Sequence, residues 1–127
     1  MNSLNKRILV VEDEPSMLAV IKDKLETEGF TVLTAHDGIE GLEVAMKEHP
    51  DLILLDILMP RMDGITALKK LREDKWGATA QVIVLSNLSS DQAVADSIKN
   101  GVYDYLIKTD WHLNDLVKII KKKLKLE

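Results

Sequence analysis

Short apolar runs alternate with longer amphipathic segments along the whole chain. The runs at 8–11 and 52–55 contain only Ile, Leu and Val, which is typical of strands buried on both faces of a sheet. In the segments that follow, apolar residues recur at spacings of three and four, as they do on one face of a helix. This alternation predicts a parallel sheet whose strands are connected by helices. The expected strands are 7–11, 30–35, 51–55, 81–85 and 104–107.

Five helices are expected between and after these strands. The first begins at Pro15, a residue type favoured in the first helical turn, and ends at Gly29. The second follows Asp37, the third surrounds Leu68, and the fourth covers 91–100. The last has the clearest apolar stripe, with Leu113, Leu116, Val117, Ile120 and Leu124 on one face. Right-handed connections would place helices on both faces of one five-stranded parallel sheet, so the expected class is α/β.

The composition limits the possible classes of protein. A chain of 127 residues with 46% hydrophobic residues has room for one domain with one core. Because it contains no cysteine, disulfides, thiolate catalysis and cysteine-bound zinc are excluded. Its net charge of -4 argues against broad nucleic-acid binding. The apolar run at 8–11 is too short for a signal-peptide core or a membrane span, so a cytoplasmic protein without membrane contact is expected.

Several polar residues are given ordinary roles. Five lysines between 118 and 125 fit the solvated face of the last helix better than an anion-contact surface. His36, His49 and His112 have no metal-ligand spacing and are expected to be exposed. Gly38 and Gly41 do not form a dinucleotide or phosphate-loop fingerprint, so no nucleotide cofactor is expected.

Charged residues follow three of the expected strands. Glu12 and Asp13 follow the first strand, Asp56 follows the third, and Lys108 follows the fifth. If the strands are parallel, their carboxyl ends share the edge where open α/β folds bind ligands. Three carboxylates gathered there would repel one another without a cation. The pattern therefore predicts a hard divalent metal, Mg2+, with a phosphoryl group beside it.

Four motifs in order resemble the receiver domain of bacterial two-component response regulators. They are Val-Glu-Asp-Glu at 11–14, Leu-Leu-Asp-Ile-Leu-Met-Pro-Arg-Met-Asp-Gly at 54–64, Leu-Ser at 85–86, and Lys108. The resemblance covers essentially the whole chain, and we expect a receiver domain over 4–125. It implies the flavodoxin-like, doubly wound fold with strand order 2-1-3-4-5.

The resemblance also implies the roles of the acidic residues. Asp56 would be the phosphoryl acceptor. Asp13, Asp56 and the backbone carbonyl of Leu58 would bind Mg2+, and Glu12 would contact it directly or through water. Lys108 would place its ammonium against a phosphoryl oxygen. Thr109 follows it where many receivers have a proline after a cis bond, and the isomer of this bond is left open by the sequence.

The remaining implied roles concern the switch and its lifetime. Ser86 would donate its hydroxyl to the phosphoryl group, and Tyr105 would move inward with it. Their movement would change the surface formed by the fourth helix, the fifth strand and the fifth helix, where a homodimer or a downstream target protein would bind. Leu58 and Leu88 flank the expected path of the hydrolytic water and cannot orient it, so slow self-dephosphorylation is expected.

The expected function is a phosphorylation-dependent signalling switch rather than an enzyme with an outside substrate. The phosphoryl donor would be a sensor histidine kinase or a phosphotransfer protein. Two alternatives stay open. An aspartate-nucleophile phosphohydrolase would need a second acid two residues after Asp56, where the chain has Leu58. A receiver-like scaffold that is never phosphorylated is supported only by Thr109. The sequence identifies neither the kinase nor the output target, nor the oligomeric state, nor whether the domain was part of a longer protein.

Overall fold

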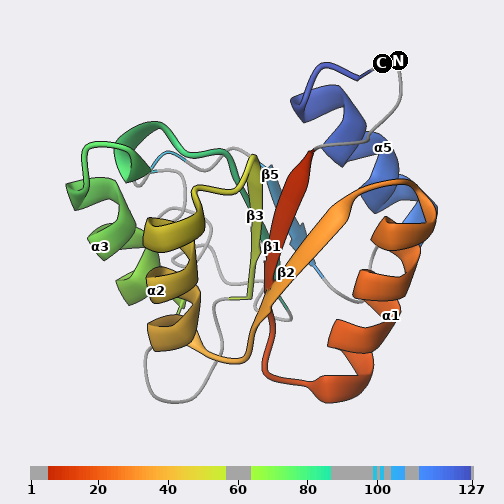
Figure 1. Cartoon of the computed structure of the whole chain (residues 1–127), viewed down its shortest axis with the longest axis horizontal. Helices are drawn as coiled ribbons and strands as arrows, with labels where there is room; N and C mark the ends of the chain where they lie inside the picture. Colours follow the sequence, from red (N-terminus) through yellow and green to blue (C-terminus); the bar gives the residue numbers. More distant parts are fainter. Residues whose placement is uncertain are drawn as a thin grey trace.

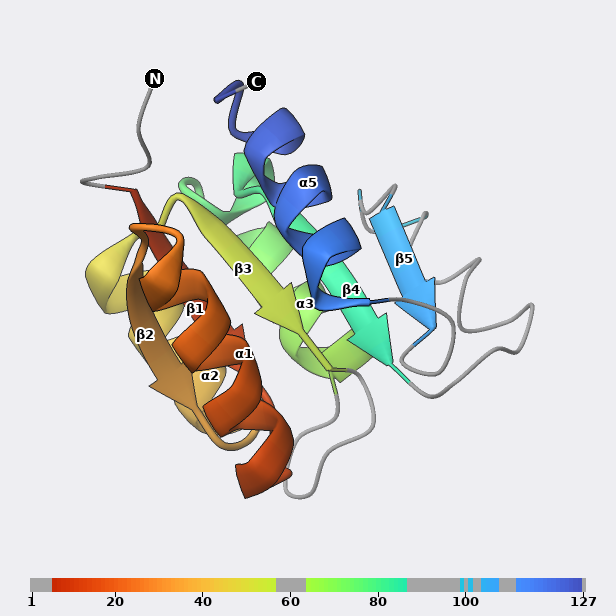
Figure 2. The ribbon, with the colours of Figure 1, turned by 90° about the vertical axis from the view of Figure 1, so that its right-hand side faces the viewer.

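A single parallel sheet forms the centre of the molecule (Figure 2). The computed structural model describes residues 6–56, 64–86, 99, 101, 104–107 and 112–126. The sheet has five strands in the order β2-β1-β3-β4-β5, and the four pairs of neighbours are all parallel. This is the expected strand order. The strands are β1 (Arg7–Val11), β2 (Thr31–Ala35), β3 (Leu52–Leu55), β4 (Val82–Ser86) and β5 (Asp104–Ile107).

Helices cover both faces of the sheet (Figure 1). Helices α1 (Pro15–Thr27) and α5 (Leu113–Lys123) lie on one face, and α2 (Gly38–Glu48) and α3 (Gly64–Glu73) lie on the other. A short 3-10 helix, η1 (Gly77–Thr79), connects α3 to β4. The fourth helix expected at 91–100 falls outside the described residues except for Lys99, whose backbone is helical.

The hydrophobic core has two halves, one on each face of the sheet. Along β1, Ile8 and Val10 belong to the cluster beneath α1 and α5, whereas Leu9 and Val11 belong to the cluster beneath α2 and α3. All four are at most 2% exposed. Successive strand residues point to opposite faces, so a strand between two helical layers must be apolar at every position. This requirement explains the uninterrupted apolar runs in the sequence.

The strand boundaries differ from expectation by one residue in places. Strand β2 begins at Thr31 rather than at Phe30, because the N–H of Phe30 donates to the carbonyl of Leu25 at 3.0 Å and so closes the end of α1. Gly29, with φ +99°, provides the left-handed backbone that this helix ending needs. Likewise β3 and β4 begin one residue later than expected, and β4 extends through Ser86.

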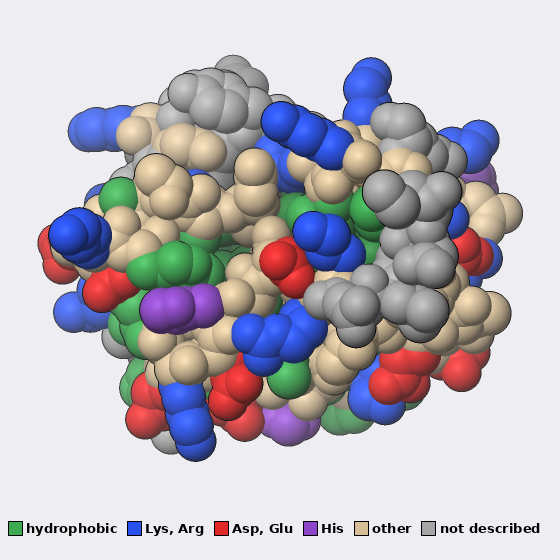
Figure 3. Space-filling view, turned by 45° about the horizontal axis from the view of Figure 1, so that its top comes forward, with side chains coloured by type: hydrophobic (Ala, Val, Ile, Leu, Met, Phe, Trp, Pro, Cys, Tyr) green, Lys and Arg blue, Asp and Glu red, His purple; other side chains and the backbone are tan. Residues whose placement is uncertain are grey.

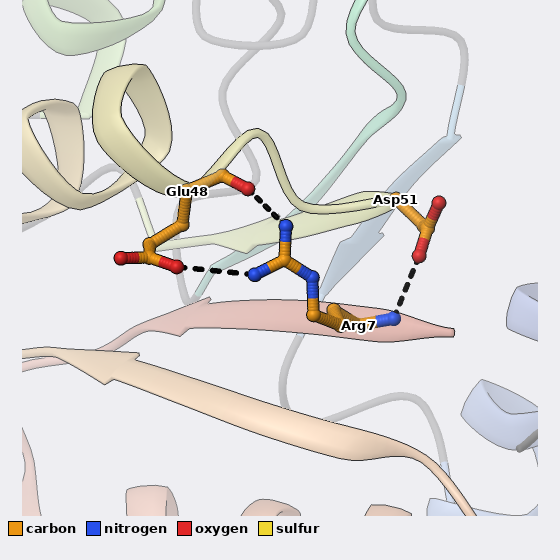
Figure 4. Close-up of polar contacts among 3 residues, drawn as sticks. All are labelled: Arg7, Glu48 and Asp51. Carbon is orange, nitrogen blue, oxygen red and sulfur yellow. Dashed lines mark hydrogen bonds and ion pairs between the residues drawn. The ribbon is translucent and has the colours of Figure 1, made fainter. Parts of the chain in front are cut away.

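Three polar residues join elements at the amino-terminal edge of the sheet (Figure 4). The Arg7 guanidinium donates to the Glu48 carboxylate at 3.1 Å and to the Glu48 carbonyl at the end of α2. The Arg7 backbone N–H donates to the Asp51 carboxylate at 2.7 Å. These bonds fix the start of β1 against α2 and β3, at the edge opposite the acidic residues.

Of the lysines in and just after α5, some contact other elements and others are exposed to solvent. Lys121 donates to Glu28 at 3.0 Å, which links α5 to the end of α1, and Lys24 pairs with the same carboxylate at 3.4 Å. Lys118, Lys122 and Lys125 are exposed. On the face shown in Figure 3, basic side chains are scattered among acidic and neutral ones rather than gathered into one patch.

The Glu28 contact predicts a pH-dependent contribution to stability. The hydrogen bond from Lys121 is the main cause that holds the pKa of Glu28 below its usual 4.5. Its stabilisation is therefore complete above about pH 4.5 and is lost as the pH falls through the lower pKa of the folded state. We expect Glu28→Gln to lower the free energy of unfolding by about 0.5–1 kcal/mol at pH 7, and to have no effect once the carboxyl is protonated.

Urea unfolding of both proteins across this pH range measures the difference. A matched control is Glu26→Gln, because Glu26 pairs with Lys22 of the same helix and both side chains are more than 40% exposed. A Glu28→Gln effect that stays constant from pH 7 to pH 3 would show that the charge of Glu28 contributes nothing.

Candidate metal and phosphoryl site

The ends of β1 and β3 place two acidic residues side by side. Val11 and Leu55 are partners in the ladder between these strands, so the residues that follow them, Glu12 and Asp56, emerge next to each other. Their backbones remain bonded to the sheet. The Asp56 N–H donates to the Val11 carbonyl at 3.1 Å, and the Glu12 N–H donates to the Ala35 carbonyl at 3.0 Å. The backbone of both acidic residues is therefore held in place by the sheet, which limits where their carboxylates can lie.

The carboxylates of Glu12, Asp13 and Asp56 come together at this edge. Each offers an oxygen, and these oxygens all lie within 4.8 Å of one another. Glu12 is 2% exposed and Asp56 is 5% exposed, whereas Asp13 is exposed. Charges of the same sign at such separations repel one another strongly where water is partly excluded. A cation bound between them would remove this repulsion.

The donor set fits Mg2+. Carboxylate oxygens are the hard ligands that this ion prefers, and it commonly keeps several waters beside one or two protein carboxylates. Asp13 faces solvent and leaves room for such waters, while the buried Asp56 and Glu12 supply the inner wall of the site. The residues present thus form a group that can hold a divalent metal, as the sequence predicted.

Glu14 is a further acidic neighbour that the sequence analysis did not single out. It is the N-cap residue of α1, and its backbone N–H donates to Glu12 Oε2 at 3.2 Å. Ser16 donates its hydroxyl to the Glu14 carboxylate at 3.1 Å. The signal was present in the run Glu-Asp-Glu-Pro, because the residue before a helix-starting proline is the capping position. The Glu12 carboxylate is thus oriented by the start of α1.

The other predicted site residues are described only in part. The backbone of Ser86 ends β4 and is paired with Ile107, the last residue of β5, so both strands end at the same edge as β1 and β3. Tyr105 lies within β5 and is paired with Val84. Leu58, Leu88 and Lys108 lie outside the described residues.

The exposure expected for the three histidines is confirmed. His36 follows β2, and its backbone N–H and ring nitrogen contact the Glu40 carboxylate at 2.7 and 3.0 Å. These contacts, the backbone bond first, lower the pKa of Glu40. His49 ends α2 and stacks on Trp76 with 4.3 Å between the ring centroids.

Comparison with known proteins gives the family of this site. The family model described as the response regulator receiver domain matches residues 8–121. The chain belongs to this family. Receiver domains are regulatory phosphoacceptors, the phosphorylation-dependent switches of two-component signalling, and the chain is a switch of this kind. Within the described residues, no helix is long and apolar enough to cross a membrane.

Two curated receiver proteins of Bacillus subtilis (strain 168) illustrate the similarity. The chain is 40% identical over 103 residues to the chemotaxis protein CheY, covering 80% of this chain and 84% of CheY. It is 38% identical over 105 residues to the alkaline phosphatase synthesis transcriptional regulatory protein PhoP, covering 83% of this chain. The chain spans less than half of PhoP, 43% of its length.

Solved receiver structures agree with the fold. A CheY-like receiver domain protein from Methanospirillum hungatei JF-1 superimposes with a TM-score of 0.89 at 33% identity, covering 97% of this chain and 95% of that one. The response regulator protein TrrA from Thermotoga maritima, solved in complex with Mg2+-BeF, has a TM-score of 0.81 at 32% identity. That alignment covers 92% of this chain and 97% of TrrA.

Proposed function

We propose that Asp56 accepts a phosphoryl group from a phosphohistidine of a sensor histidine kinase or a phosphotransfer protein, in a reaction that requires Mg2+. The observation that carries this proposal is the buried Asp56 carboxylate held within 4.8 Å of the Glu12 and Asp13 carboxylates at the carboxyl edge of the sheet. The TrrA structure with Mg2+-BeF supports the same assignment, because that relative holds a metal and a fluoride of beryllium together.

The chemistry needs an ionised, immobile nucleophile. A carboxylate oxygen of Asp56 forms the bond to phosphorus while the bond from phosphorus to the donor nitrogen breaks, and its electron pair remains on the imidazole. The backbone bond from the Asp56 N–H to Val11 keeps this carboxylate in place for attack. Glu12, Asp13 and the Leu58 carbonyl would help to hold Mg2+, which supplies positive charge for Asp56 and the phosphoryl oxygens. Lys108 would stabilise the same oxygens.

The switch would follow from the new phosphoryl anion. Ser86 would donate to it and Tyr105 would turn inward, and the surface of the fourth helix, β5 and α5 would change for a homodimer or a target protein. The phosphoryl group needs to favour this arrangement by only a few kcal/mol to convert a minor population into a major one. We further propose that the receiver domain occupies 4–125 and that residues 91–100 form the fourth helix. The cytoplasmic location and the lack of nucleic-acid and membrane contacts remain predictions.

Incubation with acetyl phosphate tests the proposal. In the presence of Mg2+, intact wild-type protein should gain one phosphoryl mass, and chelation of the metal should prevent the gain. A phosphohydrolase would instead release phosphate over many turnovers without accumulating the modified form, and a scaffold would show neither result. Either of these two outcomes would contradict the proposed function.

The apolar side chains at Leu58 and Leu88 predict a long-lived phosphoryl group. Neither side chain can hydrogen-bond the attacking water, so the double variant Leu58→Asn, Leu88→Glu should lose the phosphoryl group roughly tenfold faster or more, approaching the roughly hundredfold at which the usual contribution of a positioned proton-transferring side chain begins. The decay of the phosphorylated mass after removal of acetyl phosphate gives both rates. A Leu58→Val, Leu88→Val variant serves as the control, and equal decay in all three proteins would refute the assignment.

A further inference from the structure

One arginine side chain connects three segments at the amino-terminal edge of the sheet. Arg72 lies in the last turn of α3. Its Nη1 donates to the carbonyl oxygens of Gly77 at 2.7 Å and Ala80 at 2.8 Å, and its Nη2 donates to the carbonyl of Gly101 at 3.4 Å. Gly77 begins η1, Ala80 lies two residues before β4, and Gly101 lies three residues before β5. The side chain thus spans the entries to both strands.

The chemistry of these contacts requires arginine. The planar guanidinium carries donors in several directions and can reach carbonyls on separate segments at once, which a lysine ammonium on a flexible stem does less well. Bonds from a charged donor are stronger than those between neutral groups. The side chain is half-buried, and its desolvation lowers the pKa of Arg72. A charged group that is partly removed from water is costly unless it is hydrogen-bonded. The guanidinium therefore favours keeping the three carbonyl groups in place, which holds the segments together.

The backbone at Gly101 is shaped to meet this side chain. Gly101 has φ +81°, a conformation that residues with a Cβ rarely adopt. A Cβ built there would lie 3.4 Å from Arg72 Nε. The glycine therefore allows both the left-handed turn and the close approach of the guanidinium.

The position of the contact matters for the switch. Strand β5 pairs with β4 from Ile83–Asp104 at one end to Ser86–Ile107 at the other. The Arg72 contact lies just outside the first of these ends, and the phosphoryl site lies at the second. Strand β5 has only four residues, Asp104–Ile107. If its amino-terminal end is held in place, it can change position mainly at its carboxyl-terminal end.

We propose that Arg72 is a positioning residue for the switch: by holding Gly101 against α3, it fixes the entry of β5 so that phosphorylation at the far edge displaces the exit of this strand. The inference rests on the proposed function, because it concerns how β5 responds to the phosphoryl group. Arg72 contacts none of the three carboxylates and has no part in the chemistry at Asp56.

Amide NMR with Mg2+ and beryllium fluoride, a stand-in for the phosphoryl group, tests this role. In wild-type protein, saturation should shift the amide signals of Tyr105 and Ile107. In Arg72→Met, we expect these shifts to fall below half of the wild-type size, while the rate of phosphorylation by acetyl phosphate stays within twofold. Arg72→Lys should give an intermediate response. Gly101→Ala, which disturbs the other side of the contact, should resemble Arg72→Met.

The matched control is Arg7→Met. Arg7 also donates to a backbone carbonyl at this edge of the sheet, that of Glu48, but it lies on β1, which β3 and β4 separate from β5. Its loss should leave the response of β5 at the wild-type size. A full response in Arg72→Met, or an equal reduction in Arg7→Met, would overturn the inference alone. A wild-type protein that shows no response to beryllium fluoride would overturn the proposed function, and with it this inference.

Discussion

Replacing Asp56 with Asn should abolish the gain of phosphoryl mass from acetyl phosphate and Mg2+. The amide keeps the shape of the side chain but removes the anionic oxygen that attacks phosphorus and one charged ligand of the metal. Among the three carboxylates, Asp56 is the one that follows β3, and it is buried at the inner wall of the site beside Glu12. We expect a loss of at least a hundredfold in modified protein, measured by mass spectrometry of the intact chain.

Asp51→Asn is the matched control for this experiment. Asp51 precedes β3, at the opposite end of the same strand, where its carboxylate accepts from the Arg7 N–H at 2.7 Å. This variant should lose stability through that bond but should gain the phosphoryl mass at the wild-type rate. Persistent modification of Asp56→Asn at the wild-type level would place the acceptor on another residue.

Replacing Asp13 with Asn should lower the free energy of unfolding only when Mg2+ is present. Without the ion, removing one of three neighbouring negative charges relieves repulsion, so the free energy of unfolding should stay equal or rise. With the ion, wild-type protein gains stability by RT ln(1 + [L]/Kd), about 2.7 kcal/mol at a hundred times Kd. The variant should bind Mg2+ roughly tenfold or more weakly and lose about half of that gain, since each factor of ten in affinity is about 1.4 kcal/mol.

Urea unfolding at several Mg2+ concentrations measures both effects. Asp23→Asn is the control, since Asp23 is an exposed residue of α1 and its loss changes the net charge equally. The prediction fails if Asp13→Asn and wild-type protein gain the same stability from Mg2+, because Asp13 would then not bind the ion.

The parts of the fold that follow from hydrophobic pattern were predictable. The uninterrupted apolar runs of β1 and β3 specify strands buried on both faces, and the polar residues after them specify which side chains meet at the edge. The exact start of β2 was not predictable in this way, because Phe30 is apolar but its N–H is used to close α1. The periodicity of apolar residues indicates which side chains are buried, but it does not indicate which carbonyl accepts from a given backbone amide.

The grouping of the three carboxylates was predictable from the sequence, but its details were not. Strand ends bring Glu12, Asp13 and Asp56 together, yet the sequence does not reveal that Glu12 is buried while its neighbour Asp13 is exposed. The role of Arg72 was also hidden. Its acceptors are backbone carbonyls 5, 8 and 29 residues away. Every residue has a backbone carbonyl, so no sequence motif can identify these acceptors.

The account depends on one divalent ion bound jointly by residues that follow β1 and β3. A crystal structure determined with Mg2+ tests this most directly. We predict a single ion about 2.0–2.1 Å from an oxygen of Asp13 and an oxygen of Asp56, with Glu12 bound to it or to one of its waters. An ion held by only one of these two aspartates, or found elsewhere on the protein, would contradict the account.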